Sequence, residues 1–257
     1  MQPRRTLRGG ARSHISRGTT VRGPYVAENA VPALYAWDPL AVRFVNSGGV
    51  PKWLSRGRSR INLDQHTTNV PTAAIGRPGW TFDETADSGN GDRLIGPTSA
   101  ESGSMTSLTC CWWTVRAGTN VAGDAFQDVI GNANVAGTKG WVVLANDSTN
   151  DLSLFRYSGA LGALADFSAV SVVGTVFHFC LTYDQSNTSL YIDGVFSSSV
   201  AHAGAIDTAS LAIALGYGAE AARGFNGSNY TADIDDRVWT STEIRQHYET
   251  TRKYIGV

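Results

Sequence analysis

The segment FHFCLTY at Phe177–Tyr183 constrains the fold more than any other part of this chain, because it alternates between large apolar side chains and smaller or polar ones. Successive side chains on a β-strand point to opposite faces, so this period of two predicts a strand with an apolar inner face. We expect four side chains on that inner face: Phe177, Phe179, Leu181 and Tyr183. Three others belong to the opposite face: His178, Cys180 and Thr182.

The residues after this strand predict a meander of antiparallel strands. Asp184–Thr188 is a polar turn, and Ser189–Ile192 places Leu190 and Ile192 on one face of a returning strand. Asp193-Gly194 is a strong signal for a tight hairpin turn, after which the chain resumes at Val195-Phe196.

Short strand-like runs separated by clusters of Gly, Asn, Asp and Ser recur along the chain from Trp80. Such spacing predicts a β-sandwich or barrel, and the lack of alternating helical patterns argues against a βαβ fold. The composition fits, with 28 glycines and 17% charged residues in 257. The predicted runs are Trp80–Asp83, Ser107–Arg116, Gln127–Ile130, Gly140–Leu144, Leu152–Tyr157, Val176–Tyr183, Ser189–Ile192, Leu211–Leu215 and Ile234–Trp239.

A short helix is predicted near the C-terminus. Thr240-Ser241-Thr242-Glu243 reads as a capping box, in which a hydroxyl cap is followed three residues later by a Glu. The helix should extend to about Arg252, and Ile244 and Tyr248, one turn apart, should pack it onto the sandwich.

These segments resemble the laminin-G-like, or concanavalin A-like lectin/glucanase, domains. Those domains carry a strand of the form W-H-H-V-A-L-T-Y-D followed by L-Y-V-D-G, as at Phe177–Asp184 and Leu190–Gly194 here. Their C-terminal signature resembles Phe225–Gly227, Asp233–Trp239 and Glu243–Tyr248. The resemblance implies an all-β fold: a concanavalin A-like jelly-roll β-sandwich of two antiparallel sheets, with an extended N-terminal arm and a short C-terminal helix.

The resemblance covers about Leu34 to Tyr248 and is sharpest over 177–248. One branch of the group opens with an L-W-L-D strand and a V-x-x-W segment, similar to Leu34–Asp38 and Val50–Trp53. Its D-x-S-G-N-G motif is displaced here to Asp87–Gly91. We therefore divide the chain into an arm at 1–24 and a sandwich at 25–257.

The arm is rich in arginine and precedes a mildly acidic body, since no acidic residue occurs before Glu28. Such a segment cannot bury enough apolar surface to order by itself, so we expect it to order against a partner. An acidic protein surface is favoured as that partner, nucleic acid is a less favoured one, and a terminus without a role is the third alternative. Its candidate partner-binding residues are Arg4, Arg5, Arg8, Arg12, Arg17 and Arg22.

All three cysteines, Cys110, Cys111 and Cys180, lie in apolar segments. Cys110 and Cys111 are neighbours on one predicted strand and point to opposite faces, so they should not pair with each other. We expect three buried free thiols that act as small apolar side chains. The spacing of Cys and His predicts no zinc site.

Catalytic patterns are weak. Glycoside hydrolysis needs two carboxylates that flank the scissile bond, but no Glu of this chain is followed by Asp two positions later. Asp233, Asp235 and Asp236 come nearest, and the resemblance makes them a structural acidic strand. His178 is expected to be part of the fold. We therefore expect no enzymatic activity.

Binding sites remain open to hypothesis. The family often binds calcium through Asp and backbone carbonyls. Asp207 and Asp233 are weak candidates, with Asp147 and Asp151 as a second group, and turn-capping roles are the alternative. Sugar rings would stack on exposed aromatic side chains, and the possible ones, which are also candidates for the core, are Trp141, Tyr217, Tyr230 and Trp239.

The leading functional hypothesis is a non-enzymatic virion protein, either a phage capsid decoration (cement) protein or a tail-appendage component. It would be anchored by the arm to capsid or other virion proteins, form a homo-oligomer on the particle, and be made in the host cytoplasm, because no signal peptide or membrane segment is recognisable. The alternative is a lectin-like module that binds surface glycans, and a glycoside hydrolase is third.

Overall fold

The computed structural model describes residues 35–37, 52–53, 63–65, 71–73, 79–83, 92–99, 105–119, 125–132, 139–158, 161–206, 211–216 and 223–257. Several predictions fall outside these ranges. They are the basic arm at 1–24 with its six arginines, the aromatic candidate Tyr217 and the calcium candidate Asp207.

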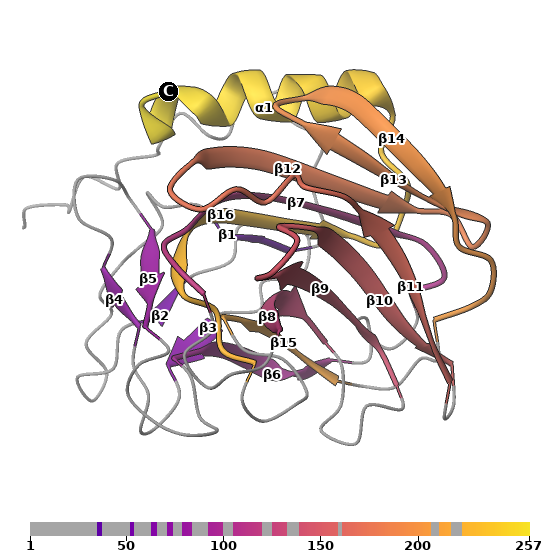
Figure 1. The fold of residues 1–257 in the computed structure, drawn as a ribbon, viewed down its shortest axis with the longest axis horizontal. Helices are drawn as coiled ribbons and strands as arrows, with labels where there is room; N and C mark the ends of the chain where they lie inside the picture. The colour runs from indigo at the N-terminus through magenta and orange to yellow at the C-terminus, as the bar shows by residue number, and fades with distance from the viewer. Residues whose placement is uncertain are drawn as a thin grey trace, which may run out of the picture.

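Two antiparallel sheets stack face to face, which confirms the predicted jelly-roll sandwich (Figure 1). Sheet A has the order β14-β13-β12-β7-β16-β5-β4, with β1 also pairing with β16. Its strands are β1 Tyr35–Trp37, β4 Thr72–Ala73, β5 Trp80–Phe82, β7 Leu108–Arg116, β12 Val176–Tyr183, β13 Asn187–Ile192, β14 Val195–Ala201 and β16 Gly227–Asp235.

Sheet B has the order β11-β10-β9-β8-β15-β6-β3-β2. Its strands are β2 Lys52–Trp53, β3 Leu63–Gln65, β6 Leu94–Ser99, β8 Phe126–Gly131, β9 Trp141–Asn146, β10 Leu152–Ser158, β11 Leu161–Phe167 and β15 Leu211–Leu215. Several of these strands are absent from the predicted runs, and the two longest of them are β6 and β11. Both contain Gly, and β6 also contains Pro97 while β11 is rich in Ala, so neither has the β-branched and aromatic content that marks a strand.

The main core lies between the inner faces of the sheets. Strand β12 supplies Phe179, Leu181 and Tyr183 to it and packs Phe177 against its edge, as the alternation predicted. The β13–β14 hairpin also follows the prediction, because Asp193 and Gly194 have φ values of 51° and 75°, the left-handed conformation of its tight turn.

Helix α1, Ser241–Ile255, lies on the outer side of sheet A (Figure 1). Thr240 is its N-cap and forms the predicted capping box with Glu243. Ile244 and Tyr248 pack against buried side chains of the sheet, also as predicted. The predicted strand at 234–239 is misplaced, since β16 ends at Asp235. Among the described residues, no helix is long and apolar enough to cross a membrane.

Candidate functional site

Arg116, the last residue of β7, occupies the rim where Asp147 was a candidate calcium ligand. Its guanidinium donates to Asp147 Oδ1 at 3.2 Å and to the Asn146 carbonyl oxygen at 2.9 Å, and it also binds Asn150. Burial lowers the pKa of Arg116, against the opposing effect of Asp147. A cation is therefore already present beside Asp147, and calcium binding by this carboxylate stays a prediction.

The other acidic candidates also have structural partners. Asp151 Oδ1 accepts a 2.8 Å hydrogen bond from the Ala169 backbone N–H, the turn-capping role that was the alternative. Asp233, 3% exposed, accepts a 2.7 Å hydrogen bond from His247 Nε2. Asp235 Oδ2 accepts from Trp239 Nε1 at 2.6 Å. Asp233 thus has a partner within the fold, in the acidic strand that the resemblance implied, and calcium binding by it stays a prediction.

Cys111 of β7 and Cys180 of β12 form a disulfide, which corrects the prediction of three free thiols. The two residues face each other directly in the antiparallel register, and their Cα atoms are 4.0 Å apart. Cys110 does not pair with its neighbour, as predicted, and is buried as a free thiol in the main core. Cys111 and Cys180 are 69 residues apart in the sequence, and only the register of β7 with β12 shows that they face each other. The spacing of the cysteines along the chain therefore could not predict this disulfide.

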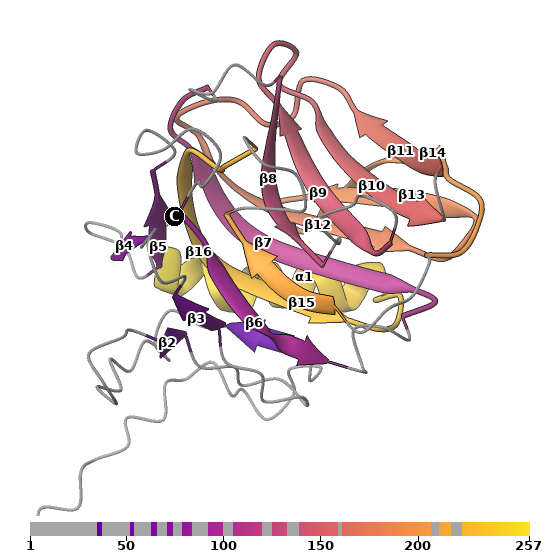
Figure 2. The same cartoon turned by 90° about the horizontal axis from the view of Figure 1, so that it is seen from below.

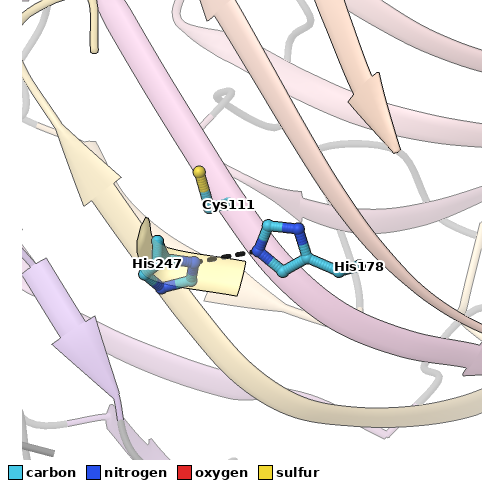
Figure 3. Close-up of side chains that lie close together, drawn as sticks. All are labelled: Cys111, His178 and His247. Carbon is cyan, nitrogen blue, oxygen red and sulfur yellow. Dashed lines mark hydrogen bonds between the residues drawn. The ribbon is translucent and has the colours of Figure 1, made fainter. Parts of the chain in front are cut away.

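His178 lies beneath α1 and is fully buried. Burial lowers its pKa well below the ordinary value, and the neighbouring His247 adds to this effect. The side chains of Cys111, His178 and His247 come from β7, β12 and α1 and lie close together, with the two imidazoles in contact (Figure 3). Their potential ligand atoms all lie within 4.8 Å of one another, a constellation that sequence spacing did not predict.

The predicted sugar-stacking residues that the structure describes are core residues. Trp141, Tyr230 and Trp239 are 0%, 6% and 3% exposed, respectively. A pyranose ring needs an open aromatic face, so these three predictions are wrong. The alternation of the strands turns Trp141 toward the space between the sheets, where it joins the main core.

A different set of aromatic side chains lies on the outer face of sheet B. Val142 pairs with Phe155, and Leu144 pairs with Ser153, across β9 and β10. Because directly paired residues share a face, the pairing partners on β8 and β11 join them there. We call this surface the β8–β11 face and define it by Phe126, Asp128, Val142, Leu144, Ser153, Phe155, Tyr157, Leu164 and Asp166.

The β8–β11 face is apolar at its centre and polar at its edges. Phe155 and Tyr157 pack edge to face with ring centroids 4.7 Å apart. The Arg223 guanidinium lies over the Phe126 ring at 5.4 Å, and its carbonyl oxygen accepts from the Asp128 backbone N–H at 2.8 Å. In Figure 2 strands β8 to β10 lie in front of β12 and α1, so this face is opposite the helix.

Two carboxylates occur in one row of the β8–β11 face, with Asp128 on β8 and Asp166 on β11. The register places them at the two ends of the row, separated by Leu144 and Ser153. Three strand spacings of about 4.8 Å separate them by about 14 Å. The acid and base of a glycosidase are about 5 to 9.5 Å apart, so this pair does not match a hydrolytic site.

Comparison with known proteins supports the architecture. A family profile described as the concanavalin A-like lectin/glucanases superfamily matches residues 88–245. No curated protein sequence matches the chain.

Three solved structures with a similar fold are binding domains of botulinum neurotoxins. The binding domain of neurotoxin DC in complex with rat synaptotagmin II is 11% identical, with a TM-score of 0.62. The type G receptor binding domain is 12% identical (TM-score 0.60), and the DC domain in complex with SialylT is 13% identical (TM-score 0.60). Each match covers 85% of this chain and 51% of the solved chain. The chain thus spans about half their length, and the likeness shows a shared fold.

Proposed function

Since this chain belongs to the concanavalin A-like lectin/glucanase superfamily, we propose that it is a non-catalytic glycan-binding module whose site is the β8–β11 face. The observation that carries the proposal is the pair of partly exposed aromatic side chains on that face, Phe126 and Phe155, bordered by Asp166 and Arg223, while the buried Tyr157 packs beneath Phe155 and supports it.

The chemistry of this face suits a sugar. Apolar ring faces offer a surface for the C–H side of a pyranose, and a few polar groups around them set its orientation. Asp166 is exposed and accepts a hydrogen bond from Ser153 Oγ, and a carboxylate has further acceptor positions for sugar hydroxyls. Leu164, 38% exposed, continues the apolar surface along β11.

Two of the similar solved structures motivate the ligand class. One is described as a complex with SialylT, and another, of neurotoxin type C, as dependent on two ganglioside molecules for cell entry. Those statements concern the toxins. They support a glycan as the first ligand to test here.

The test is a glycan array followed by titration calorimetry with the strongest ligand. Phe155→Ala and Asp166→Ala should each weaken binding by about tenfold or more, equivalent to about 1.4 kcal/mol. Phe196→Ala is the matched control, because Phe196 is an aromatic residue 54% exposed on β14 of the other sheet. A thermal melt of each variant separates lost binding from lost folding. Equal affinity in all four proteins would disprove the proposed site.

The proposal also includes the absence of catalysis. The approximately 14 Å separation of Asp128 and Asp166 supports this, because it exceeds the spacing of a glycosidase pair. Incubation of the bound glycan with the protein should leave it intact, as judged by mass spectrometry. Release of a shorter glycan that depends on Asp166 would contradict it.

A virion role is a second candidate, and the observation that favours it is the basic arm at 1–24 with six arginines before the first acidic residue. In this proposal the arm anchors the module to capsid or other virion proteins, the chain forms a homo-oligomer on the particle, and the sandwich presents its glycan-binding face outward. Deletion of residues 1–24 should abolish incorporation into particles but leave glycan affinity unchanged. Unchanged incorporation would refute the anchoring role.

A further inference from the structure

The surface of sheet A beneath α1 carries a row of side chains with metal-ligating atoms. The register places Cys111 of β7 directly between Cys180 of β12 and Asp233 of β16. In the next row, His178 is two residues from Cys180 on the same strand and therefore on the same face. Cys111, Cys180 and His178 are all fully buried, so these polar groups share one dry compartment.

Helix α1 brings a further potential ligand, His247, over this row. His247 Nδ1 lies 2.8 Å from His178 Nε2, and His247 Nε2 lies 2.7 Å from Asp233 Oδ2. In the tautomer whose Nε2–H donates a hydrogen bond to Asp233 Oδ2, the lone pair of His247 Nδ1 faces His178 and the interior. The helix therefore presents an imidazole nitrogen to the compartment, and the contact with a carboxylate orients the ring.

Three of the four proposed ligand atoms lie close together, and Cys180 Sγ joins them through its bond to Cys111 Sγ. Cys111 Sγ and the two imidazole nitrogens lie within 4.8 Å of one another. Zinc binds nitrogen at about 2.0 to 2.1 Å and sulfur at about 2.3 Å, so ligand atoms in a tetrahedral site are about 3.3 to 3.8 Å apart. The two imidazole nitrogens need to separate by about 0.5 Å from their 2.8 Å contact to accept the ion between them.

We propose that the reduced protein binds one Zn²⁺ beneath α1 through Cys111 Sγ, Cys180 Sγ, His178 Nε2 and His247 Nδ1. Two thiolates and two imidazoles are a set that zinc prefers in closed structural sites. Asp233 supports His247 from behind, in the arrangement of a carboxylate, a histidine and a metal that orients such ligands. Rings of Trp113, Trp239 and Tyr248 pack around the two histidines and keep the site dry.

The oxidised and zinc-bound states exclude each other. In the disulfide, both sulfurs are bonded to each other and neither is a thiolate. A dithiol reductant supplies two electrons and two protons, breaks the Cys111–Cys180 bond and leaves as its own disulfide. Zinc then displaces the two thiol protons to solvent, and the ring proton of His178 moves from Nε2 to Nδ1. The cluster can therefore bind zinc only when the disulfide is reduced.

In the structure, His178 Nε2 lies against His247 Nδ1, so zinc binding at Nε2 moves the ring proton of His178 to its Nδ1 atom. The proton that moves to Nδ1 meets no hydrogen-bond partner among the described residues, and this reduces the affinity of the site. The expected function is stabilisation: zinc would tie α1 to β7 and β12 when the disulfide is absent.

The experiment is titration of the fully reduced chain with Co²⁺ and Zn²⁺ under anaerobic conditions. Tetrahedral coordination by two thiolates should produce cobalt absorption bands, one equivalent of Zn²⁺ should abolish them, and the melting temperature should rise with zinc. The disulfide form should show neither effect. Cys111→Ser and Cys180→Ser should each weaken zinc binding by at least about 100-fold, and Asp233→Asn by about 10- to 100-fold.

Cys110→Ala is the matched control, because Cys110 is the neighbour of Cys111 on β7 but points into the main core. Burial raises the pKa of its thiol, which keeps it protonated. This variant should bind zinc like the parent. The proposal fails if the reduced chain binds no cobalt, if the oxidised chain binds equally well, or if Cys110→Ala loses as much affinity as Cys111→Ser. Some variants will be less stable than the parent without metal. For these, the change in melting temperature on adding zinc to the same variant still measures zinc binding.

Discussion

The indole N–H of Trp113 on β7 donates a 2.6 Å hydrogen bond to the hydroxyl oxygen of Thr251 on α1. Both side chains are buried, and Thr251 Oγ donates in turn to the His247 carbonyl oxygen at 2.8 Å. The same indole stacks on Tyr248 with centroids 5.5 Å apart. The helix is therefore attached to sheet A by a directional polar contact within an otherwise aromatic interface.

Replacing Thr251 with valine should destabilise the protein by about 1 to 3 kcal/mol, because it leaves the buried Trp113 N–H without an acceptor while the volume stays almost constant. Urea unfolding followed by tryptophan fluorescence measures the change. Thr242→Val is the control, since Thr242 is an exposed residue of the same helix. A similar loss in both variants would show that the hydrogen bond contributes little.

Stability should fall as the pH drops from about 7 to 5. Burial lowers the pKa of His178 in the folded state, so the unfolded chain, with a His pKa of about 6.5, binds more protons in this range. The contribution of this group is complete above the unfolded pKa and decreases below it, by at most about 1.4 kcal/mol per pH unit.

Urea midpoints between pH 5 and 7 measure this dependence. His178→Gln should flatten it. Glu243, whose pKa is lowered by its hydrogen bonds to Arg237 and Thr240 despite opposing desolvation, would contribute its loss of stability nearer pH 4 and below. An unchanged slope in His178→Gln would assign the effect to another group.

Arg116→Lys should cost about 1 to 3 kcal/mol although it preserves the charge. The buried guanidinium contacts Asp147, Asn150 and the Asn146 carbonyl oxygen at once, and an ammonium cannot reproduce that planar arrangement of donors. Arg252→Lys, at an exposed ion pair with Glu249, should change stability by less than about 0.5 kcal/mol. Thermal melts compare the two, and equal shifts would contradict the assigned role of Arg116.

Gly194→Ala should be more damaging than Gly174→Ala. Both glycines have a left-handed φ, of 75° and 78°, so each substitution strains the backbone by about 1 to 2 kcal/mol. A Cβ on Gly194 would in addition lie 2.8 Å from Cβ of Tyr248, whereas one on Gly174 meets nothing within 4 Å. The difference between the two melting temperatures therefore reports the close approach of the β13–β14 turn to α1. Equal decreases in melting temperature for the two variants would mean that α1 moves away from the added methyl group at no cost in stability.

Removal of the helix cap by Thr240→Ala should cost about 0.5 to 2 kcal/mol, because Thr240 Oγ accepts from the Glu243 backbone N–H at the start of α1. Chemical unfolding measures it, with Thr242→Ala as the control at an uncapped position of the first turn. Equal free energies of unfolding for the two variants would show that the capping box contributes little to stability.

Short sequence patterns correctly predicted those elements that are specified by neighbouring residues. The alternation of β12, the Asp193-Gly194 turn and the Thr240–Glu243 capping box each depend on residues within a few positions of one another. The strands β6 and β11 escaped prediction because their Gly, Ala and Pro residues carry no strand signal, and their pairing partners supply the stability instead.

The candidate sites depended on contacts that are distant in sequence. Trp141 was a candidate for an exposed platform and is in the core, while Phe155, in a run predicted only as a strand, is partly exposed on the outer face of sheet B. An aromatic residue near a loop gives no indication of which face it occupies until the register with its neighbours is known.

The amino-acid sequence by itself determined the class of the fold, the meander around β12 and the capped C-terminal helix, because period, turn residues and caps act over short stretches of chain. The tertiary structure alone decided which polar groups meet. Cys111 and Cys180 lie 69 positions apart, and His178 and His247 also lie 69 apart, yet strand register and the docking of α1 bring all four together between the helix and sheet A. The sequence specifies which side chains are present, but these four side chains come close together only when the strands pair and the helix packs on the sheet.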